Sequence, residues 1–329
     1  MREPTFWWQA NGGGLLAPLA GIYGAVAASR LKSPGRKAGI PVICVGNLTM
    51  GGAGKTPAAL TVGRLLLSKN KRPFFLTRGY GGRLAGPVRV DPTIHSAADV
   101  GDEPLLLAAL APTIVARDRV AGAAAARHEG ANVIVMDDGF QNPALAKDLA
   151  ILAIDGRRAV GNGRVFPAGP LRAPLEVQVA RAHAVLIVGN PTEGMASILE
   201  VARRHGVAIF HGSLEPDQAS LDALSERRVL AFAGIADPEK FYATLRETGV
   251  TVVEHASFPD HHRYTAAEAR DLIQRADAAR LALITTEKDY ARFAGDAALA
   301  DLAARASVLR VQLQVKEESE FRRLILSAA

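Results

Sequence analysis

Residues 42–57 read VICVGNLTMGGAGKTP. The apolar run Val42–Val45 predicts a strand, and Pro57–Leu67 predicts a helix. A glycine-rich loop that joins a strand to a helix and ends in Lys-Thr is typical of a P-loop, in which backbone N–H groups and the helix N-terminus bind phosphate oxygens. Thr49 stands where the strict pattern has glycine, so the motif is a variant.

Two side chains of this loop add chemistry that its backbone lacks. Lys55 puts a positive charge beside the β- and γ-phosphates, so we count it as catalytic, and the Thr56 hydroxyl can ligate Mg²⁺. The predicted nucleotide-binding residues are Asn47, Thr49, Met50, Gly51, Gly52, Ala53, Gly54, Lys55 and Thr56. The alternative is a glycine-rich turn followed by a surface lysine.

A second apolar run, Val133–Met136, predicts a strand that ends in Asp137 and Asp138. This is the Walker B arrangement, in which a carboxylate at the strand end faces the P-loop and holds Mg²⁺ directly or through water. Neighbouring strand residues point to opposite faces, so we expect one of the two aspartates to lie closer to the metal. The alternative is a pair of turn residues before Gly139.

Two shorter motifs carry candidate proton-transfer residues. Asp102, in GDEP at 101–104, is either the N-cap of a helix predicted at 105–111 or a general base for a substrate hydroxyl. His261 lies in FPDHHRY at 258–264. Its two adjacent histidines either form a weak metal-binding motif or provide one histidine that orients a carboxylate.

The composition limits the class of partner. The chain has 329 residues, a formal net charge of +6 and a pI of about 9.6, which favours an anionic partner. The basic residues are scattered and no aromatic–basic stacking patch is visible, so the sequence argues against nucleic acid. The single cysteine, Cys44, excludes an internal disulfide and is predicted to be buried in a strand.

Apolar runs and helical patterns alternate along the chain, which predicts βαβ units and a mostly parallel sheet with helices on both faces. Further strands of this larger unit are expected at 74–76, 113–115, 150–154 and 184–188, and further helices at 121–128 and 194–204. A smaller α/β unit is expected from strands at 229–233, 250–254 and 282–285 and helices at 238–248 and 266–276.

Segments 207–214 and 307–313 flank this smaller unit and both alternate, so we expect them to pair as a two-stranded connector. A last helix is expected at 317–326 and is predicted to return to the larger unit. The predicted domains are therefore 1–212, with 313–329 returning to it, and a smaller domain at 213–312 that closes over the site.

The N-terminal stretch Pro4–Ser29 carries no charged side chain, begins with aromatic residues and ends at a basic flank. A transmembrane helix is disfavoured because Pro18 and several glycines dilute the apolar run. A signal peptide is disfavoured because a nucleotide site follows so closely. We favour a helix at the membrane surface, with residues 1–37 on anionic lipid. The alternative is a helix packed on its own protein.

In this order, the motifs resemble the tetraacyldisaccharide 4′-kinase family of lipid A biosynthesis. The resemblance runs nearly end to end. It is carried by the aromatic N-terminal segment, GNLTMGGAGKTP (46–57), TRGYG (77–81), GDEP (101–104), ARDR (116–119), MDDGFQ (136–141), GNGR (161–164), FPAGP (166–170), FPDHH (258–262) and TTEKD (285–289). Phe166 stands where the family usually carries an aliphatic residue.

The resemblance implies a two-domain kinase, peripheral at the cytoplasmic face of the bacterial inner membrane. It implies that MgATP phosphorylates the 4′-hydroxyl of a tetraacylated glucosamine disaccharide 1-phosphate, a membrane glycolipid, to form lipid IVA. Asp102 and His261 would then abstract the proton. The expected metal ligands are Thr56, Asp137, Asp138 and Glu103, and the expected lining residues are Arg78, Arg119 and Gln141.

The competing function is a P-loop nucleotide-hydrolysing switch or metallochaperone. Such proteins usually bind guanine with Asn-Lys-x-Asp, but Lys288 and Asp289 are adjacent here, so that pattern fails. A second competitor is a nucleotide-dependent membrane-binding module without catalysis. The carboxylates of Asp102 and Asp138 argue against it, because binding phosphate alone favours fewer acids nearby.

Overall fold

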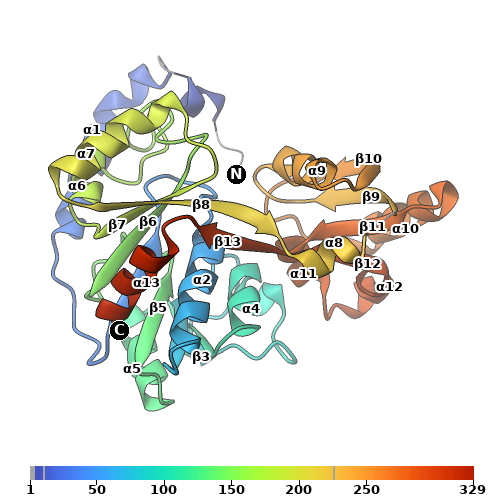
Figure 1. Ribbon diagram of the computed structural model, residues 1–329, viewed down its shortest axis with the longest axis horizontal. Helices are drawn as coiled ribbons and strands as arrows, with labels where there is room; N and C mark the ends of the chain where they lie inside the picture. Colours follow the sequence, from blue (N-terminus) through green and yellow to red (C-terminus); the bar gives the residue numbers. More distant parts are fainter. Residues whose placement is uncertain (1–3, 10–11, 225–226) are drawn as a thin grey trace.

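The computed structural model describes residues 4–9, 12–224 and 227–329, and in them the chain forms two β-sheets of nine and four strands (Figure 1). The larger sheet has the order β13-β8-β7-β6-β1-β5-β2-β4-β3, with β1 (Val42–Gly46), β2 (Pro73–Thr77), β3 (Val88–Arg89), β4 (Thr113–Val115), β5 (Val133–Asp137), β6 (Leu149–Asp155), β7 (Ala184–Val188), β8 (Ala208–Pro216) and β13 (Val311–Val315). The smaller sheet has the order β10-β9-β11-β12, with β9 (Arg228–Ala233), β10 (Thr251–Ser257), β11 (Ala282–Thr286) and β12 (Ala306–Leu309).

Helices cover both faces of each sheet. They are α1 (Ala17–Leu31), α2 (Lys55–Leu67), α3 (Ala97–Val100), α4 (Asp102–Ala108), α5 (Arg119–His128), α6 (Leu175–Val179), α7 (Ala196–Arg204), α8 (Gln218–Asp222), α9 (Pro238–Glu247), α10 (Ala266–Ala279), α11 (Glu287–Phe293), α12 (Ala300–Arg305) and α13 (Glu318–Ser327). The pairings of the larger sheet are parallel except at β3 and β13, so the predicted α/β class is confirmed.

The alternation of β1 shows how the sequence builds two cores. Val42 and Cys44 face a core that includes residues of α5, α6 and α7. Ile43 and Val45 face the opposite core, which includes residues of α2, α4 and α13. All four side chains are buried, as expected for a central parallel strand covered on both faces. The C-terminal helix thus packs on the larger sheet, although the smaller sheet precedes it in the chain.

The smaller sheet has its own two cores. Leu230 and Phe232 pack with residues of α10, α11 and α12 on one face. Val229 and Ala231 pack with residues of α9 on the other.

The connector between the units differs from the prediction in one segment. β8 and β13 pair antiparallel, from Val311 opposite Pro216 to Val315 opposite Gly212. The segment predicted to supply the second strand, 307–313, is split, because β12 pairs with β11 in the smaller sheet. An alternating pattern predicts a strand but does not identify the sheet to which the strand belongs. The predicted segment 307–313 therefore covers parts of two strands, which belong to different sheets.

Helix α1 packs on the protein through Ala20 and Gly24, which are buried. Its large apolar side chains are exposed: Leu15, just before it, is 100% exposed, and Ile22 is 68% exposed. By length and composition, the helical stretch Gly14–Leu31 can cross a membrane, with a mean hydropathy of 1.3 and 11% of it buried. A helix packed wholly on its own protein does not describe this segment. Residues 1–3 and 10–11 of the predicted membrane segment lie outside the described residues.

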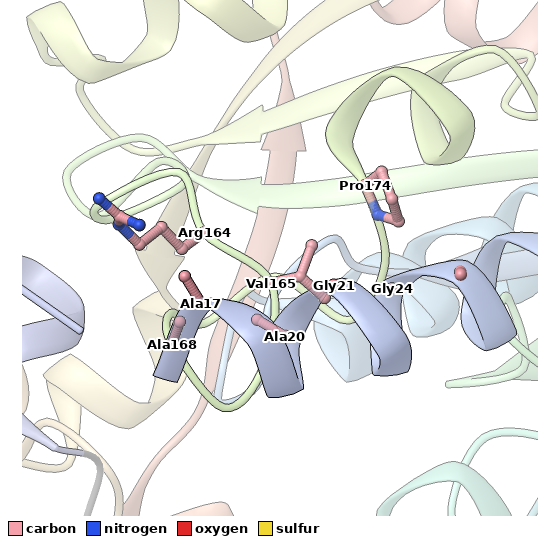
Figure 2. A pocket seen from close by; sticks show the side chains of 9 residues that line it. Ala17, Ala20, Gly21, Gly24, Arg164, Val165, Ala168 and Pro174 are labelled. Carbon is pink, nitrogen blue, oxygen red and sulfur yellow. The ribbon is translucent and has the colours of Figure 1, made fainter. Parts of the chain in front are cut away.

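A cavity of about 270 Å³ lies between α1 and the loop that precedes α6 (Figure 2). Its described lining is Ala17, Ala20, Gly21, Gly24, Ala25, Arg164, Val165, Ala168 and Pro174. None of these residues was predicted to bind nucleotide. The residues that were predicted to do so follow the carboxyl end of β1, the edge at which ligands bind open α/β sheets.

Candidate functional site

Lys55, the first residue of α2, bonds back to the loop between β1 and α2. The Nζ atom of Lys55 donates to the carbonyl oxygen of Gly51 at 3.3 Å and lies 3.8 Å from Oδ2 of Asp138. Gly51 and Gly54 have φ values of 89° and 76°, which favour glycine and let the loop turn tightly into the helix. Burial lowers the pKa of Lys55. A buried ammonium in a loop of this shape is suited to bind phosphate oxygens.

Asp137 lies at the end of β5 and has one oxygen without a partner. Its Oδ2 accepts from the Thr56 hydroxyl at 3.2 Å, while its buried Oδ1 has no hydrogen-bond partner among the described residues. The pKa of Asp137 is raised to about 7, first by burial and then by the charges of Glu103 and Asp138. A hydroxyl beside an unpaired buried carboxylate oxygen fits a hard cation such as Mg²⁺.

The described residues hold no group of three or more His, Cys, Asp or Glu side chains arranged around a metal.

Asp138, unlike Asp137, is paired with cationic side chains. Arg172 donates to both of its carboxylate oxygens, from Nη1 at 2.8 Å and from Nη2 at 3.2 Å. Burial acts to raise the pKa of Asp138, but Lys55 and Arg172 outweigh burial and hold the pKa below its ordinary value. Arg172 also donates to the carbonyl of Thr49, so one side chain braces both the P-loop and the aspartate.

Gln141 also braces the P-loop, next to Arg172, which donates to its Oε1 at 3.3 Å. Its Nε2 donates to the carbonyl of Asn47 at 2.8 Å and to Oε1 of the buried Gln178 at 3.0 Å. Arg119 is buried, and its Nε has no hydrogen-bond partner among the described residues. Burial lowers the pKa of Arg119, and the charge of Arg78 lowers it further, so the two guanidinium groups are close enough to interact.

Asp102 and His261 come together from different units. Oδ2 of Asp102 lies 3.4 Å from Nδ1 of His261. The hydrogen bond to Asp102 raises the pKa of His261. The N-cap of α4 is Gly101, and Asp102 is the first residue of the helix, so the N-cap interpretation of Asp102 is wrong. The backbone of His261 is in the left-handed region, at φ 56°.

Glu103, predicted as a metal ligand, pairs with a lysine of the smaller unit. Its Oε1 accepts from Nζ of Lys288 at 2.7 Å, and the charge of Lys288 lowers the pKa of Glu103. Helix α4 contacts α2, the helix that follows the P-loop, and the charge of Glu103 acts on the pKa of Lys55 and Asp137. The predicted motifs at 46–57, 101–104 and 136–141 therefore meet at one place.

Three charged residues of this cluster were not predicted as site residues: Arg172, Lys288 and Arg292. Arg172 lies just beyond the stretch FPAGPL at 166–171 that carries part of the family resemblance. Lys288 lies inside TTEKD, which carries part of the family resemblance, but no site role was predicted for it. Arg292 has no motif of its own, and its partner in the larger unit, Asp102, is remote in sequence.

Comparison with known proteins agrees with the motifs. The family model for tetraacyldisaccharide-1-P 4′-kinase matches residues 13–329. A tetraacyldisaccharide 4′-kinase of Rhodopseudomonas palustris strain BisB5 is 52% identical over 328 residues, covering 99% of this chain and 96% of that protein. Its counterpart in Afipia carboxidovorans is 52% identical over 322 residues, covering 97% and 94%. A crystal structure of LpxK from Aquifex aeolicus in complex with ATP aligns with a TM-score of 0.74 at 29% identity, covering 95% of this chain and 98% of that one.

Proposed function

This chain belongs to the tetraacyldisaccharide-1-P 4′-kinase family, and from this membership we infer the reaction that it catalyses. It transfers the γ-phosphate of ATP to the 4′-hydroxyl of a tetraacylated glucosamine disaccharide 1-phosphate, forming lipid IVA. Full-length similarity to kinases supports this function over a nucleotide-hydrolysing switch. The site observation that carries the proposal is the buried Thr56–Asp137 pair, with its unpaired oxygen, beside the lysine of a P-loop.

We propose the following roles for the site. The backbone of residues 49–56 and Lys55 hold the phosphates, while Thr56 and Asp137 hold Mg²⁺, which offsets charge on the transferred group. Asp138 keeps Arg172 and Lys55 directed at the phosphates. Asp102 and His261 take the proton from the 4′-hydroxyl as its oxygen bonds to the γ-phosphorus, and the bond to the bridging oxygen of ADP breaks.

Glu103 is proposed to act near the metal through its charge, because Lys288 already binds its carboxylate. Arg78 and Arg119 are proposed to line the site where the glycolipid binds, since two neighbouring guanidinium groups favour an anionic group. Gln141 and Asn47 are proposed to keep the P-loop in shape.

We also propose that the protein is peripheral and lies on the cytoplasmic face of the inner membrane through residues 1–37. The exposed side chains of Leu15, Leu19, Ile22 and Val26 support this placement, because an apolar helix face gains affinity when it enters the interface. The basic flank of Arg30, Lys32, Arg36 and Lys37 adds attraction to anionic lipid.

The proposed domain division is 1–212 together with 313–329, and 213–312. It is supported by the separate cores of the two sheets and by the packing of Phe321 and Ile325 from α13 in the core beneath α2.

The decisive experiment mixes purified protein in detergent with MgATP and candidate lipid disaccharides, and follows transfer of labelled γ-phosphate. Transfer to the tetraacylated disaccharide 1-phosphate is expected. The control variant Lys55→Ala should lose about a thousandfold or more of the rate while keeping a normal circular dichroism spectrum. Nucleotide hydrolysis without lipid phosphorylation would overturn the proposal.

A further inference from the structure

The deepest charged contact between the two units is made by a residue that carries no predicted motif. Arg292, on α11, donates from Nε at 2.9 Å and from Nη2 at 2.7 Å to Oδ2 of Asp102 on α4. The two side chains are 5% and 4% exposed. An ion pair this buried persists only when both partners are well hydrogen-bonded, so the surroundings of each partner matter.

Arg292 is held in place by groups of the smaller unit. Its Nη1 donates to the carbonyl of Gly234 and, at 2.7 Å, to Oδ1 of Asp289. Asp289 in turn accepts from the backbone N–H of Gly234, the Tyr264 hydroxyl and the Thr286 hydroxyl. The guanidinium group is thus fixed in one orientation by groups of the smaller unit alone, and its remaining donors point out of that unit toward Asp102.

Asp102 depends on this guanidinium for its position. Its Oδ1 accepts the N–H of Glu103 at 3.0 Å, a bond within its own helix. Across to the smaller unit, its partners among the described residues are Arg292 and His261. The contact with His261 is 3.4 Å long and His261 is 40% exposed, so that contact alone is too weak to fix the carboxylate.

We propose that Arg292 is a positioning residue of the kinase reaction, which fixes the Asp102 carboxylate against His261 when the two units meet. The proposal rests on the role of Asp102 given under the proposed function. Arg292 uses all three of its nitrogens on acceptors of both units. A lysine has a single nitrogen and cannot reproduce this fork, so Arg292→Lys is not a conservative change here.

The test is a double-mutant cycle on the full-length protein, with Arg292→Met, Asp102→Asn and the double variant. Arg292→Met should lower kcat about a hundredfold, as a small misplacement of a reacting group does. The KM for ATP should stay within about twofold, because the P-loop is untouched. In the Asp102→Asn background, Arg292→Met should lower kcat little further, since the group that it positions is already lost.

The matched control is Arg275→Met. Arg275 lies on α10 of the same unit and pairs with Glu254 and Asp271 at the surface. It should leave kcat unchanged in both backgrounds. Thermal unfolding of every variant is measured alongside. If Arg292→Met lacks a cooperative transition, Arg292→Lys takes its place in the cycle, with the same non-additive loss of kcat expected.

Two results would overturn the proposal while leaving the base in place: an undiminished kcat in Arg292→Met, or an equal fold loss with and without Asp102. The second result would show a purely structural role. A wild-type kcat in Asp102→Asn would instead contradict the proposed role of Asp102, and this inference would fall with it. Phosphate transfer by the wild-type protein tests the kinase function separately.

Discussion

Asp137 and Asp138 are neighbours in the chain with opposite electrostatic surroundings. Burial raises the pKa of Asp137 to about 7, and one of its oxygens lacks a partner in the described part of the chain. Asp138 is held ionised by Lys55 and Arg172, which outweigh its burial. The difference arises at Asp138, whose φ of 51° turns the chain as the strand ends. Asp137 thus needs a cation that the protein does not supply, whereas Asp138 already has two.

This contrast predicts which aspartate binds magnesium. Asp137→Asn should raise the Mg²⁺ concentration for half-maximal rate about tenfold or more, because a direct ligand is lost. Asp138→Asn should mainly lower kcat, because Arg172 and Lys55 lose the anion that orients them. Initial rates measured against free Mg²⁺ at saturating ATP separate the two effects. The opposite ranking of the two variants would make Asp138 the metal ligand.

His261 predicts a pH dependence of stability. Its pKa is raised in the folded protein, first by the hydrogen bond to Asp102. Its contribution to stability is therefore fully present below the unfolded pKa of about 6.5 and is lost as the pH rises through the folded pKa. His261→Asn should lower Tm more at about pH 5.5 than at about pH 8.5. In an Asp102→Asn background this pH difference should shrink, leaving the smaller part that the charge of Asp260 causes; an undiminished difference would show that Asp102 does not cause it.

At the scale of elements, helix α1 exposes its large side chains and buries its small ones. Deleting residues 1–30 would also remove Trp7, which is buried and donates to the carbonyl of Pro167, so deletion tests packing as well as membrane binding. Ile22 is exposed and a change there leaves the packed face intact.

We therefore predict that Leu19→Asp with Ile22→Asp releases the protein from anionic vesicles while ATP binding stays unchanged. The physical reason is the loss of apolar burial in the interface together with added repulsion from anionic lipid. Vesicle flotation at low and high salt measures it. The control is Val253→Asp, which changes an exposed apolar residue on β10 of the smaller unit. Equal flotation of all variants would leave α1 as an ordinary surface helix.

The elements that the sequence predicted share a physical basis. Strands β1 and β5 and helix α2 were predicted because the apolar patterns and glycines that specify them lie within each element or next to it in the sequence. Helix α11 was missed, although its start carries a local signal: Thr286 accepts from the N–H of Asp289, a Thr-x-x-Asp cap. The sheet change between β12 and β13 has no such signal, because a strand's partners are set by contacts far away in sequence.

The same distinction applies to the site. The P-loop and the aspartate pair at the end of β5 could be predicted because each lies within a few residues of a strand end. Arg172 and Arg292 could not, since their roles come from Asp138 and Asp102, which are 34 and 190 residues away. Single-sequence patterns carry no information about such partners.

At the scale of the whole molecule, two ion pairs join the units at one point. Asp102 and Glu103 are consecutive at the start of α4, while Arg292 and Lys288 lie one turn apart on α11. The acids belong to the larger unit and the cations to the smaller one. The strand pair β8–β13 runs between the units, so the chain connection and the charged contact constrain the same interface (Figure 1). The proposed base is therefore assembled from both units, not contained in either.

This assembly yields the last prediction, that Asp102 and His261 act as one unit in catalysis. Burial acts to raise the pKa of Asp102, but His261 and Arg292 outweigh it, so the carboxylate is ionised. Asp102→Ala and His261→Ala should each lower kcat strongly, and the double variant should be little worse than the poorer single one. ATP affinity should change little in all three. If the fold losses of kcat in the two single variants multiply in the double variant, the two residues have independent roles. A large loss of ATP affinity in Asp102→Ala would make that residue a magnesium ligand instead of a base.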